Sequence, residues 1–160
     1  MEYKLANLIS VVIPFYSRER GILARSVESA LAQKSVDVEV IVVDDASPIS
    51  AADELSNIRD ERLKIIRHQF NTNGGIARNT GIKNSNGFFI AFLDFDDIWY
   101  VNKLKKQFDY YRQLLSQHEK PVIYSQANII DGKREFIRPI RGIREKESVG
   151  DYLFLSLIHI

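Results

Sequence analysis

The sequence predicts an α/β fold in which a mostly parallel sheet is covered by helices on both faces. Short apolar segments rich in β-branched residues alternate with segments whose apolar residues recur every three or four positions. The first pattern is typical of buried strands and the second of amphipathic helices. Acidic residues directly follow two of the predicted strands, at the place where open α/β sheets bind their ligands.

The predicted elements follow one another with short connections. In order they are strand 9–15, helix 20–33, strand 38–43, helix 50–58, strand 63–67, helix 75–83, strand 88–93, helix 101–117 and strand 121–125. We expect a turn at 128–132, and we expect the charged, aperiodic stretch 133–147 to be the most mobile part. All 160 residues are predicted to form one domain, with 133–160 mobile or incomplete.

The composition excludes several classes of function. The chain has no cysteine, which excludes disulfides, thiol catalysis and cysteine-based zinc sites. With 22 basic and 21 acidic residues, it lacks the positive charge that a broad nucleic-acid-binding surface needs. No apolar run approaches the roughly 18 residues that span a membrane, and residues 1–8 show no secretory pattern. We therefore expect a cytoplasmic protein, free or peripheral at the inner face of the membrane.

Five acidic residues are predicted to meet at one edge of the sheet. Asp44 and Asp45 follow the second strand, and three more follow the fourth, namely Asp94, Asp96 and Asp97. Because the carboxyl ends of parallel strands share an edge, these carboxylates would repel one another in a partly desolvated cleft. A divalent cation would offset this charge, and a nearby arginine is the second possibility.

Each acidic cluster on its own has two interpretations. Asp94 and Asp96, two apart in an extended segment, point the same way and can share a hard cation such as Mg²⁺ or Mn²⁺. An acidic turn that caps the next helix explains them equally well. For Asp44 and Asp45, an ordinary Asx turn is favoured over binding of a ribose or base until the second cluster is considered.

The segment around Asn73 is a candidate phosphate-binding site. Gly74 and Gly75 bring backbone N–H groups to the start of a predicted helix, where anions bind favourably. Arg78, one turn later, is either a surface arginine or a residue that faces the acidic cleft. Its helical spacing from Gly74 and Gly81 favours the cleft.

Aromatic and histidine residues carry weaker indications. Trp99 and Tyr100 follow the second acidic cluster, and we interpret them as a wedge in the core rather than a sugar-stacking platform. His68, His118 and His159 show no metal-ligand spacing and are interpreted as incidental.

Five segments in a fixed order carry a family resemblance. They cover residues 9–16, 26–33, 39–47, 73–81 and 87–99. Together they resemble the N-terminal half of a family 2 glycosyltransferase with the GT-A fold. The resemblance implies a nucleotide-sugar-binding α/β domain.

The resemblance also implies roles for individual residues at the nucleotide. Pro14, Tyr16 and Asp45 match positions that line the nucleobase pocket, where Asp45 accepts a hydrogen bond from a uracil-type N–H. Arg78 and Asn79 match a helix start that faces the nucleotide and the sugar.

The metal site is implied by the same resemblance. Asp94 and Asp96 match the Asp-x-Asp motif, in which Asp96 is the direct ligand of Mn²⁺ or Mg²⁺ and Asp94 lies near the ribose or sugar. Phe95 stands where the family usually has a small residue, so the shape of the cleft departs from the family pattern.

The implied activity is inverting transfer of a sugar from a nucleotide sugar, expected to be a UDP-sugar, to a glycan or lipid-linked acceptor in cell-surface polysaccharide synthesis. Full family members are longer, and their general base and acceptor-binding half lie in the part missing here. Asp131 and Asp151 are candidates for the base only by default. We therefore expect a chain truncated before the acceptor-binding part.

Three alternative functions are compared with the same sequence features. A non-catalytic nucleotide-binding or interaction module would explain the absent acceptor half. A nucleotidyltransferase would have a loop rich in glycine and basic residues at 16–20, and a dehydrogenase would have G-x-G-x-x-G there; the chain has neither. The apolar segment 152–160 predicts self-association.

Overall fold

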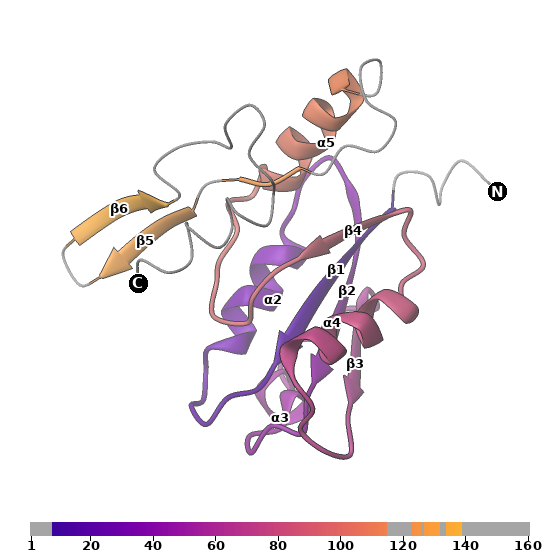
Figure 1. Cartoon of the computed structure of the whole chain (residues 1–160), viewed down its shortest axis with the longest axis vertical. Helices are drawn as coiled ribbons and strands as arrows, with labels where there is room; N and C mark the ends of the chain where they lie inside the picture. Colours follow the sequence, from indigo (N-terminus) through magenta and orange to yellow (C-terminus); the bar gives the residue numbers. More distant parts are fainter. Residues whose placement is uncertain (1–7, 115–122, 126, 132–133, 139–160) are drawn as a thin grey trace. The chain divides into compact units, whose positions relative to one another are not determined.

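The computed structural model describes residues 8–114, 123–125, 127–131 and 134–138 (Figure 1). The chain divides into two compact units after Leu114, and each is described by itself. The prediction of one domain over 1–160 stays a prediction. In the described part of the chain, no helix has the length and apolar character needed to cross a membrane.

The first unit is built on a four-stranded parallel sheet. Its strands are β1 Leu8–Phe15, β2 Asp37–Asp44, β3 Leu63–Arg67 and β4 Phe89–Phe92, in the order β3-β2-β1-β4. Every neighbouring pair is parallel. The four predicted strands and their parallel arrangement are confirmed, and the carboxyl ends of β2 and β4 flank that of β1.

Four helices lie in the described part of this unit. They are α2 Leu23–Leu31, α3 Ala51–Glu54, α4 Gly74–Lys83 and α5 Lys103–Leu114. Each lies within or almost within a predicted helix, although α3 is only one turn long. Residues 115–117 of the last predicted helix lie outside the described residues.

The helices cover both faces of the sheet. On one face, Val11 of β1 packs in the same buried cluster as Leu23 of α2. On the other face, Ile41 of β2 packs with Ala77 of α4. Alternate residues of each strand therefore enter different cores, as expected for a sheet buried on both sides.

Helix α4 lies directly on the central strand at Gly81. A Cβ atom at this position would lie 2.2 Å from Cγ1 of Val12, a distance that real contacts do not reach. The missing side chain of Gly81 therefore allows the close approach that brings the first turn of α4 to the end of β1. The sequence prediction of a helix through this glycine is confirmed.

The second unit contains a hairpin where we expected other structure. Strand β5 Ala127–Asp131 pairs antiparallel with β6 Arg134–Arg138. The predicted strand 121–125 is wrong for residues 123–125, which form no strand, and the predicted turn at 128–132 is wrong for residues 128–131, which lie in β5. The mobility expected of 133–147 stays a prediction. The sequence carries an Asp-Gly pair, Asp131-Gly132, directly after the apolar, β-branched residues Ile129 and Ile130, and such a pair is typical of hairpins.

Several other predictions fall on residues outside the described ranges. These are the incidental roles of His118 and His159, the default base Asp151 and the self-association of segment 152–160.

Glu39 fastens β4 to the amino-terminal part of the sheet. Its carboxylate accepts hydrogen bonds from the Ser10 hydroxyl at 2.5 Å, from the Asn86 backbone N–H at 2.6 Å and from the Gly87 backbone N–H at 3.1 Å. Burial tends to raise the pKa of Glu39, but these hydrogen bonds prevail and lower it below its ordinary value.

Replacing Glu39 with glutamine should change how stability depends on pH. Because the pKa is lower in the folded state, the carboxylate stabilises the fold above its unfolded pKa, and this contribution is lost as pH falls through the folded value. We expect Glu39→Gln to cost about 1–2 kcal/mol at neutral pH and to flatten the fall in Tm between about pH 5 and pH 3. Glu28→Gln, on the exposed side of α2, is the control. An unchanged slope in Glu39→Gln would contradict this role.

Candidate active site

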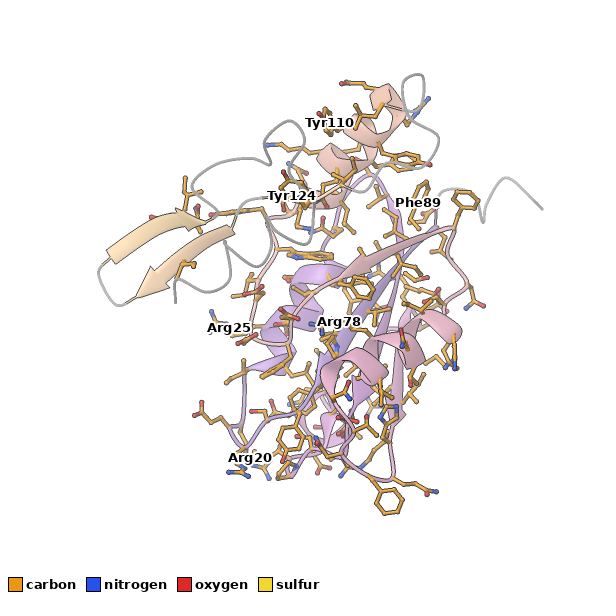
Figure 2. All side chains as sticks on the ribbon, in the orientation of Figure 1. Arg20, Arg25, Arg78, Phe89, Tyr110 and Tyr124 are labelled. Atoms are coloured by element: carbon orange, nitrogen blue, oxygen red, sulfur yellow. The ribbon has the colours of Figure 1, made fainter. Side chains whose placement is uncertain are left out.

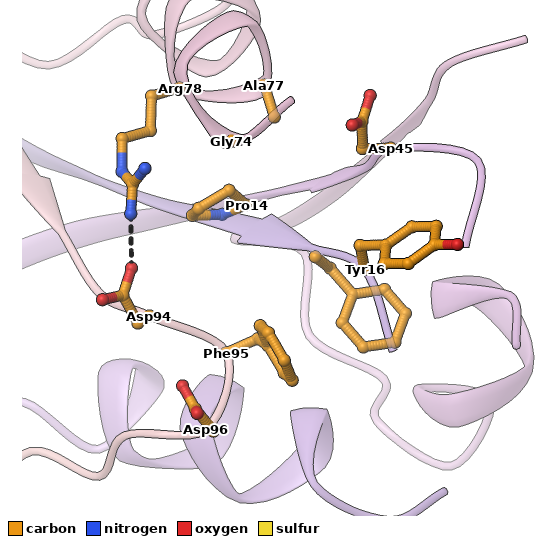
Figure 3. A pocket seen from close by; sticks show the side chains of 10 residues that line it. Pro14, Tyr16, Asp45, Gly74, Ala77, Arg78, Asp94, Phe95 and Asp96 are labelled. Atoms are coloured by element: carbon orange, nitrogen blue, oxygen red, sulfur yellow. Dashed lines mark hydrogen bonds and ion pairs between the residues drawn. The ribbon is translucent and has the colours of Figure 1, made fainter. Parts of the chain in front are cut away.

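A pocket of about 300 Å³ lies at the carboxyl-terminal edge of the sheet (Figure 3). Four segments line it: the end of β1, the end of β2, the start of α4 and the segment after β4. The lining residues are Pro14, Phe15, Tyr16, Asp45, Gly74, Ala77, Arg78, Asp94, Phe95 and Asp96. The parallel sheet thus brings both acidic clusters of the sequence to one pocket.

The pocket has two chemically different ends. Asp45 and Tyr16 lie at one end in Figure 3, and Asp94 and Asp96 lie at the other, with Pro14 between them. Of the residues to which the family resemblance gave a role at the nucleotide or the metal, all line this pocket except Asn79, which is exposed on α4. Asp44, Asp97 and Gly75, which were expected at the same edge, are not among its lining residues.

Asp45 is held rigidly although it lines the pocket. Its residue surface is only 3% exposed. Oδ1 accepts from the Thr72 hydroxyl at 2.6 Å and lies 2.7 Å from Nδ1 of His68, while Oδ2 accepts from the Thr72 backbone N–H at 2.9 Å. Burial tends to raise the pKa of Asp45, but the hydrogen bonds from Thr72 and His68 prevail and lower it. The carboxylate is therefore kept ionised in a nearly dry setting.

Asp44, its neighbour, has a structural role. Its fully buried carboxylate accepts from the backbone N–H groups of Ser47 at 2.7 Å and Ala51 at 2.9 Å, and it forms an ion pair with Arg67. These contacts fix the turn after β2, in which Ala46 has the left-handed φ of 56°. The Asx-turn interpretation thus fits Asp44, whereas Asp45 lines the pocket.

The turn after β2 also positions the segment that carries Tyr16. The Ser47 hydroxyl accepts from the Ser17 backbone N–H at 2.9 Å and donates to the Ser17 carbonyl at 2.8 Å. Tyr16 itself is 39% exposed, so its ring is open to a ligand.

Polar side chains of α2 hold the acidic segment by its backbone. The Ser26 hydroxyl lies 2.6 Å from the carbonyl oxygens of both Phe95 and Asp97. The Ser29 hydroxyl accepts from the Trp99 N–H at 3.1 Å. Because α2 is anchored in the core, these contacts fix the segment without using its carboxylates.

Gln33, one turn beyond Ser29, completes this anchorage. Its amide donates to the carbonyl of Tyr100 at 2.9 Å and accepts from the backbone N–H of Leu104 at 2.9 Å. The start of α5 is therefore fixed to α2 as well. The wedge interpretation holds for Trp99, which packs against the core, and is wrong for Tyr100, which is 73% exposed.

Phe95 separates Asp94 and Asp96 in space as well as in sequence. Its ring packs edge-on against Phe15, with centroids 5.5 Å apart. Asp94 and Asp96 both line the pocket on either side of it (Figure 3). The bulky residue is thus accommodated by the core, and both carboxylates remain at the pocket.

Arg78, labelled in Figure 2, forms an ion pair with Asp94. Its guanidinium donates to Oδ1 of Asp94 at 2.6 Å (Figure 3). A Cβ atom added to Gly74 would lie 3.1 Å from Nη1 of Arg78, so the glycine leaves room for this guanidinium. Of the two interpretations of Arg78, the structure supports the one that faces the acidic cleft.

The expected repulsion between the carboxylates is relieved largely by protein groups. Asp44, Asp45 and Asp94 have partners from other elements, as described above. Partial burial, and then the charges of Asp96 and Asp94, raise the pKa of Asp97. Within the described ranges, no ion pair involves Asp96.

The donor set fits a hard cation only with help from a ligand. Among the described residues, no group of three or more potential metal ligands is close enough to hold an ion alone. Asp94 and Asp96 offer two carboxylates at one end of the pocket. Mg²⁺ and similar ions are often bound by one or two carboxylates together with substrate phosphates and water. The residues therefore fit a cation that binds with a diphosphate.

Sequence reasoning missed some residues that build this site. His68, interpreted as incidental, contacts Asp45, and Thr72 supplies two further hydrogen bonds to the same carboxylate. Neither residue has a spacing signal, because both contacts are tertiary. For Ser26 and Ser29 a signal did exist: they are polar residues three apart on the buried face of α2.

Comparison with known proteins places the chain in a family. The family described as Glycosyl transferase family 2 matches residues 10–152. The chain belongs to this family. Its predicted membership and its GT-A-like fold are thus confirmed.

Curated relatives are longer proteins of polysaccharide synthesis. The succinoglycan biosynthesis protein ExoW of Rhizobium meliloti (strain 1021) is 47% identical over 96 residues, which cover 57% of this chain and 30% of ExoW. The amylovoran biosynthesis glycosyltransferase AmsB of Erwinia amylovora is 36% identical over 151 residues, covering 91% of this chain and 50% of AmsB. The chain thus spans half or less of the length of these relatives.

A solved structure shares the fold. The crystal structure of Staphylococcus aureus TarS 1-349 in complex with UDP superimposes with a TM-score of 0.59 and 28% sequence identity. The match covers 66% of this chain and 32% of the TarS chain.

Asp44→Asn should lower the free energy of unfolding more than an equivalent substitution at the surface. The substitution removes a buried carboxylate that accepts hydrogen bonds from two backbone N–H groups and forms an ion pair with Arg67. We therefore expect the free energy of unfolding, measured with urea, to fall by about 2–3 kcal/mol. Asp60→Asn, in the more exposed pair with Arg62, should cost less than about 1 kcal/mol. Equal losses in the two variants would show that Asp44 does not anchor the turn.

Proposed function

We propose that this chain is the donor-binding part of a metal-dependent, inverting glycosyltransferase. It would transfer a sugar from a UDP-sugar to a glycan or lipid-linked acceptor in the synthesis of a cell-surface polysaccharide. The observation that carries this proposal is the single pocket lined by both Asp45 and the pair Asp94 and Asp96. A nucleotide diphosphate has a base at one end and anionic oxygens at the other, which matches the two ends of this pocket.

The names of similar proteins support the choice of donor and acceptor. One relative from Escherichia coli is a UDP-Glc:alpha-D-GlcNAc-diphosphoundecaprenol beta-1,3-glucosyltransferase, WfgD, 39% identical over 100 residues that cover 62% of this chain and 39% of WfgD. TarS 1-349 was crystallised with UDP and with UDP-GlcNAc. Both names point to a uridine nucleotide sugar, and the first to a lipid-linked acceptor.

The base would bind at the end formed by Asp45, Tyr16 and Pro14. An ionised carboxylate is an acceptor only, so Asp45 would take a hydrogen bond from the ring N–H of uracil. The exposed ring of Tyr16 offers a surface on which a base can stack. Arg78 and Asn79, on the first turns of α4, would serve the diphosphate and the sugar.

The diphosphate would lie at the end formed by Arg78, Asp94 and Asp96. Arg78 would turn from Asp94 to a phosphate oxygen, since a guanidinium binds either anion. Asp96, with Asp94 beside it, would then hold Mn²⁺ or Mg²⁺. Such an ion, when bound, stabilises the negative charge of a leaving diphosphate.

The transfer itself would be a displacement at the anomeric carbon. The acceptor oxygen forms a bond to this carbon as the bond to the diphosphate oxygen breaks, and the acceptor proton passes to a general base. We assign no described residue as that base. It would come from the acceptor-binding part that longer relatives contain.

Calorimetry with UDP and Mn²⁺ tests the donor site. We expect the wild-type chain to bind UDP in the presence of Mn²⁺, and Asp96→Ala to weaken this binding by about tenfold or more, because it removes one of the two carboxylates that would hold the ion. Asp109→Ala removes a carboxylate on α5 that pairs with Lys105, and it should leave the affinity within about twofold.

Two outcomes would contradict parts of this proposal. If wild type binds no UDP, or if Asp96→Ala binds it as tightly, the site assignment is wrong. If the chain, and a version extended to the full length of its relatives, bind the donor without transferring or hydrolysing it, the protein is a non-catalytic nucleotide-binding module.

A further inference from the structure

His68 lies between the base end of the pocket and helix α4. It directly follows β3, and its backbone N–H donates to the Asp44 carbonyl at 2.8 Å, which continues the pairing of β3 with β2. Its side chain is only 15% exposed. The sheet therefore fixes the point from which the imidazole ring extends.

Both ring nitrogens of His68 are engaged. Nδ1 lies 2.7 Å from Oδ1 of Asp45, and Nε2 lies 2.9 Å from the hydroxyl oxygen of Thr80 on α4. Because an ionised carboxylate can only accept, Nδ1 carries the hydrogen and donates to Asp45. The Thr80 hydroxyl can donate to a neutral ring or accept from a charged one, so the bridge persists in either protonation state of the histidine.

The described contacts leave one oxygen of Asp45 with spare acceptor capacity. His68 and the Thr72 hydroxyl both bind Oδ1, whereas the Thr72 backbone N–H is shared, 2.9 Å from Oδ2 and 3.1 Å from Oδ1. A carboxylate oxygen can accept two hydrogen bonds. The geometry thus holds the carboxylate in one orientation, and the described contacts fill only one of the two acceptor positions of Oδ2.

We propose that His68 is a positioning residue that sets the nucleobase preference of the pocket. This inference rests on the proposed function. By donating to Oδ1, His68 keeps Asp45 ionised and oriented, so that Oδ2 meets the base as an acceptor only. Such a group pairs with the ring N–H of uracil and opposes the bare acceptor nitrogen that cytosine has at the same ring position. Without His68, Asp45 could rotate or take up a proton and accommodate either base.

A matched pair of variants at position 68 separates this role from simple packing. In His68→Asn the amide nitrogen occupies nearly the place of Nδ1 and can still donate to Asp45. In His68→Leu a side chain of similar size has no donor. The measured quantity is the ratio of UDP to CDP affinity, determined by calorimetry with Mn²⁺ on the 160-residue chain, with Tm recorded for each variant.

We expect wild type to favour UDP over CDP by about tenfold or more, because an unpaired buried polar group opposes the wrong base. His68→Asn should retain most of this preference, and His68→Leu should reduce the ratio to within about twofold. Thr80→Val should retain the ratio, since Nδ1 still donates to Asp45. If His68→Leu does not fold, His68→Gln, whose amide nitrogen lies near Nε2 rather than Nδ1, takes its place with the same expected loss.

The results also distinguish this inference from the proposed function. If wild type prefers UDP and His68→Leu or His68→Gln keeps the same ratio, His68 does not set the preference, and the donor site stands without it. If wild type binds neither nucleotide, or both equally, the inference is overturned. Only the absence of UDP binding also overturns the proposed function.

Discussion

The central position of β1 is the constraint on which the site depends. β2 and β4 pair with β1 from its two sides, in parallel and in a fixed register, so the segments that follow them leave the sheet at the same edge. One face of β1 is anchored in the core shared with α2. On the other face, the contact at Gly81 brings α4 close enough for Gly74 and Arg78 to reach the same edge.

Carboxylates that cluster at one sheet edge repel one another, and neighbouring protein groups offset most of this repulsion. Arg67 neutralises Asp44 inside the fold, His68 and Thr72 hold Asp45, and Arg78 covers Asp94. The pocket is therefore assembled before any ligand binds, which lowers the ordering cost of binding. Arg78 and Asp94 are both partly exposed, so their pair is the one that a diphosphate can exchange most easily.

Most of the first unit could be predicted from the sequence because its signals are local. The β-branched runs that became β1 and β2 and the three- and four-residue spacing of α2 determine these elements without tertiary information. The sequence also predicted that Asp45 and Asp96 lie at the same edge of the sheet, since parallel strands end at a common edge.

The remaining features depend on tertiary contacts or on short signals. His68 has no motif around it, and its role exists only because β3 ends beside Asp45 and opposite Thr80. The hairpin formed by β5 and β6 has little hydrophobic periodicity, so its signal in the sequence is limited to the Asp131-Gly132 pair. Gln33 likewise carries no signal in the sequence, because its contacts with Tyr100 and Leu104 are tertiary.

A crystal structure of the chain with UDP and Mn²⁺ tests the central claim most directly, because it locates the base and the ion together. We expect the uracil N–H within hydrogen-bond distance of Oδ2 of Asp45, and anomalous density for manganese between the Asp96 carboxylate and the diphosphate. Uracil bound away from Asp45, or manganese bound without Asp96, would contradict the claim that this sheet edge is built to hold a nucleotide diphosphate.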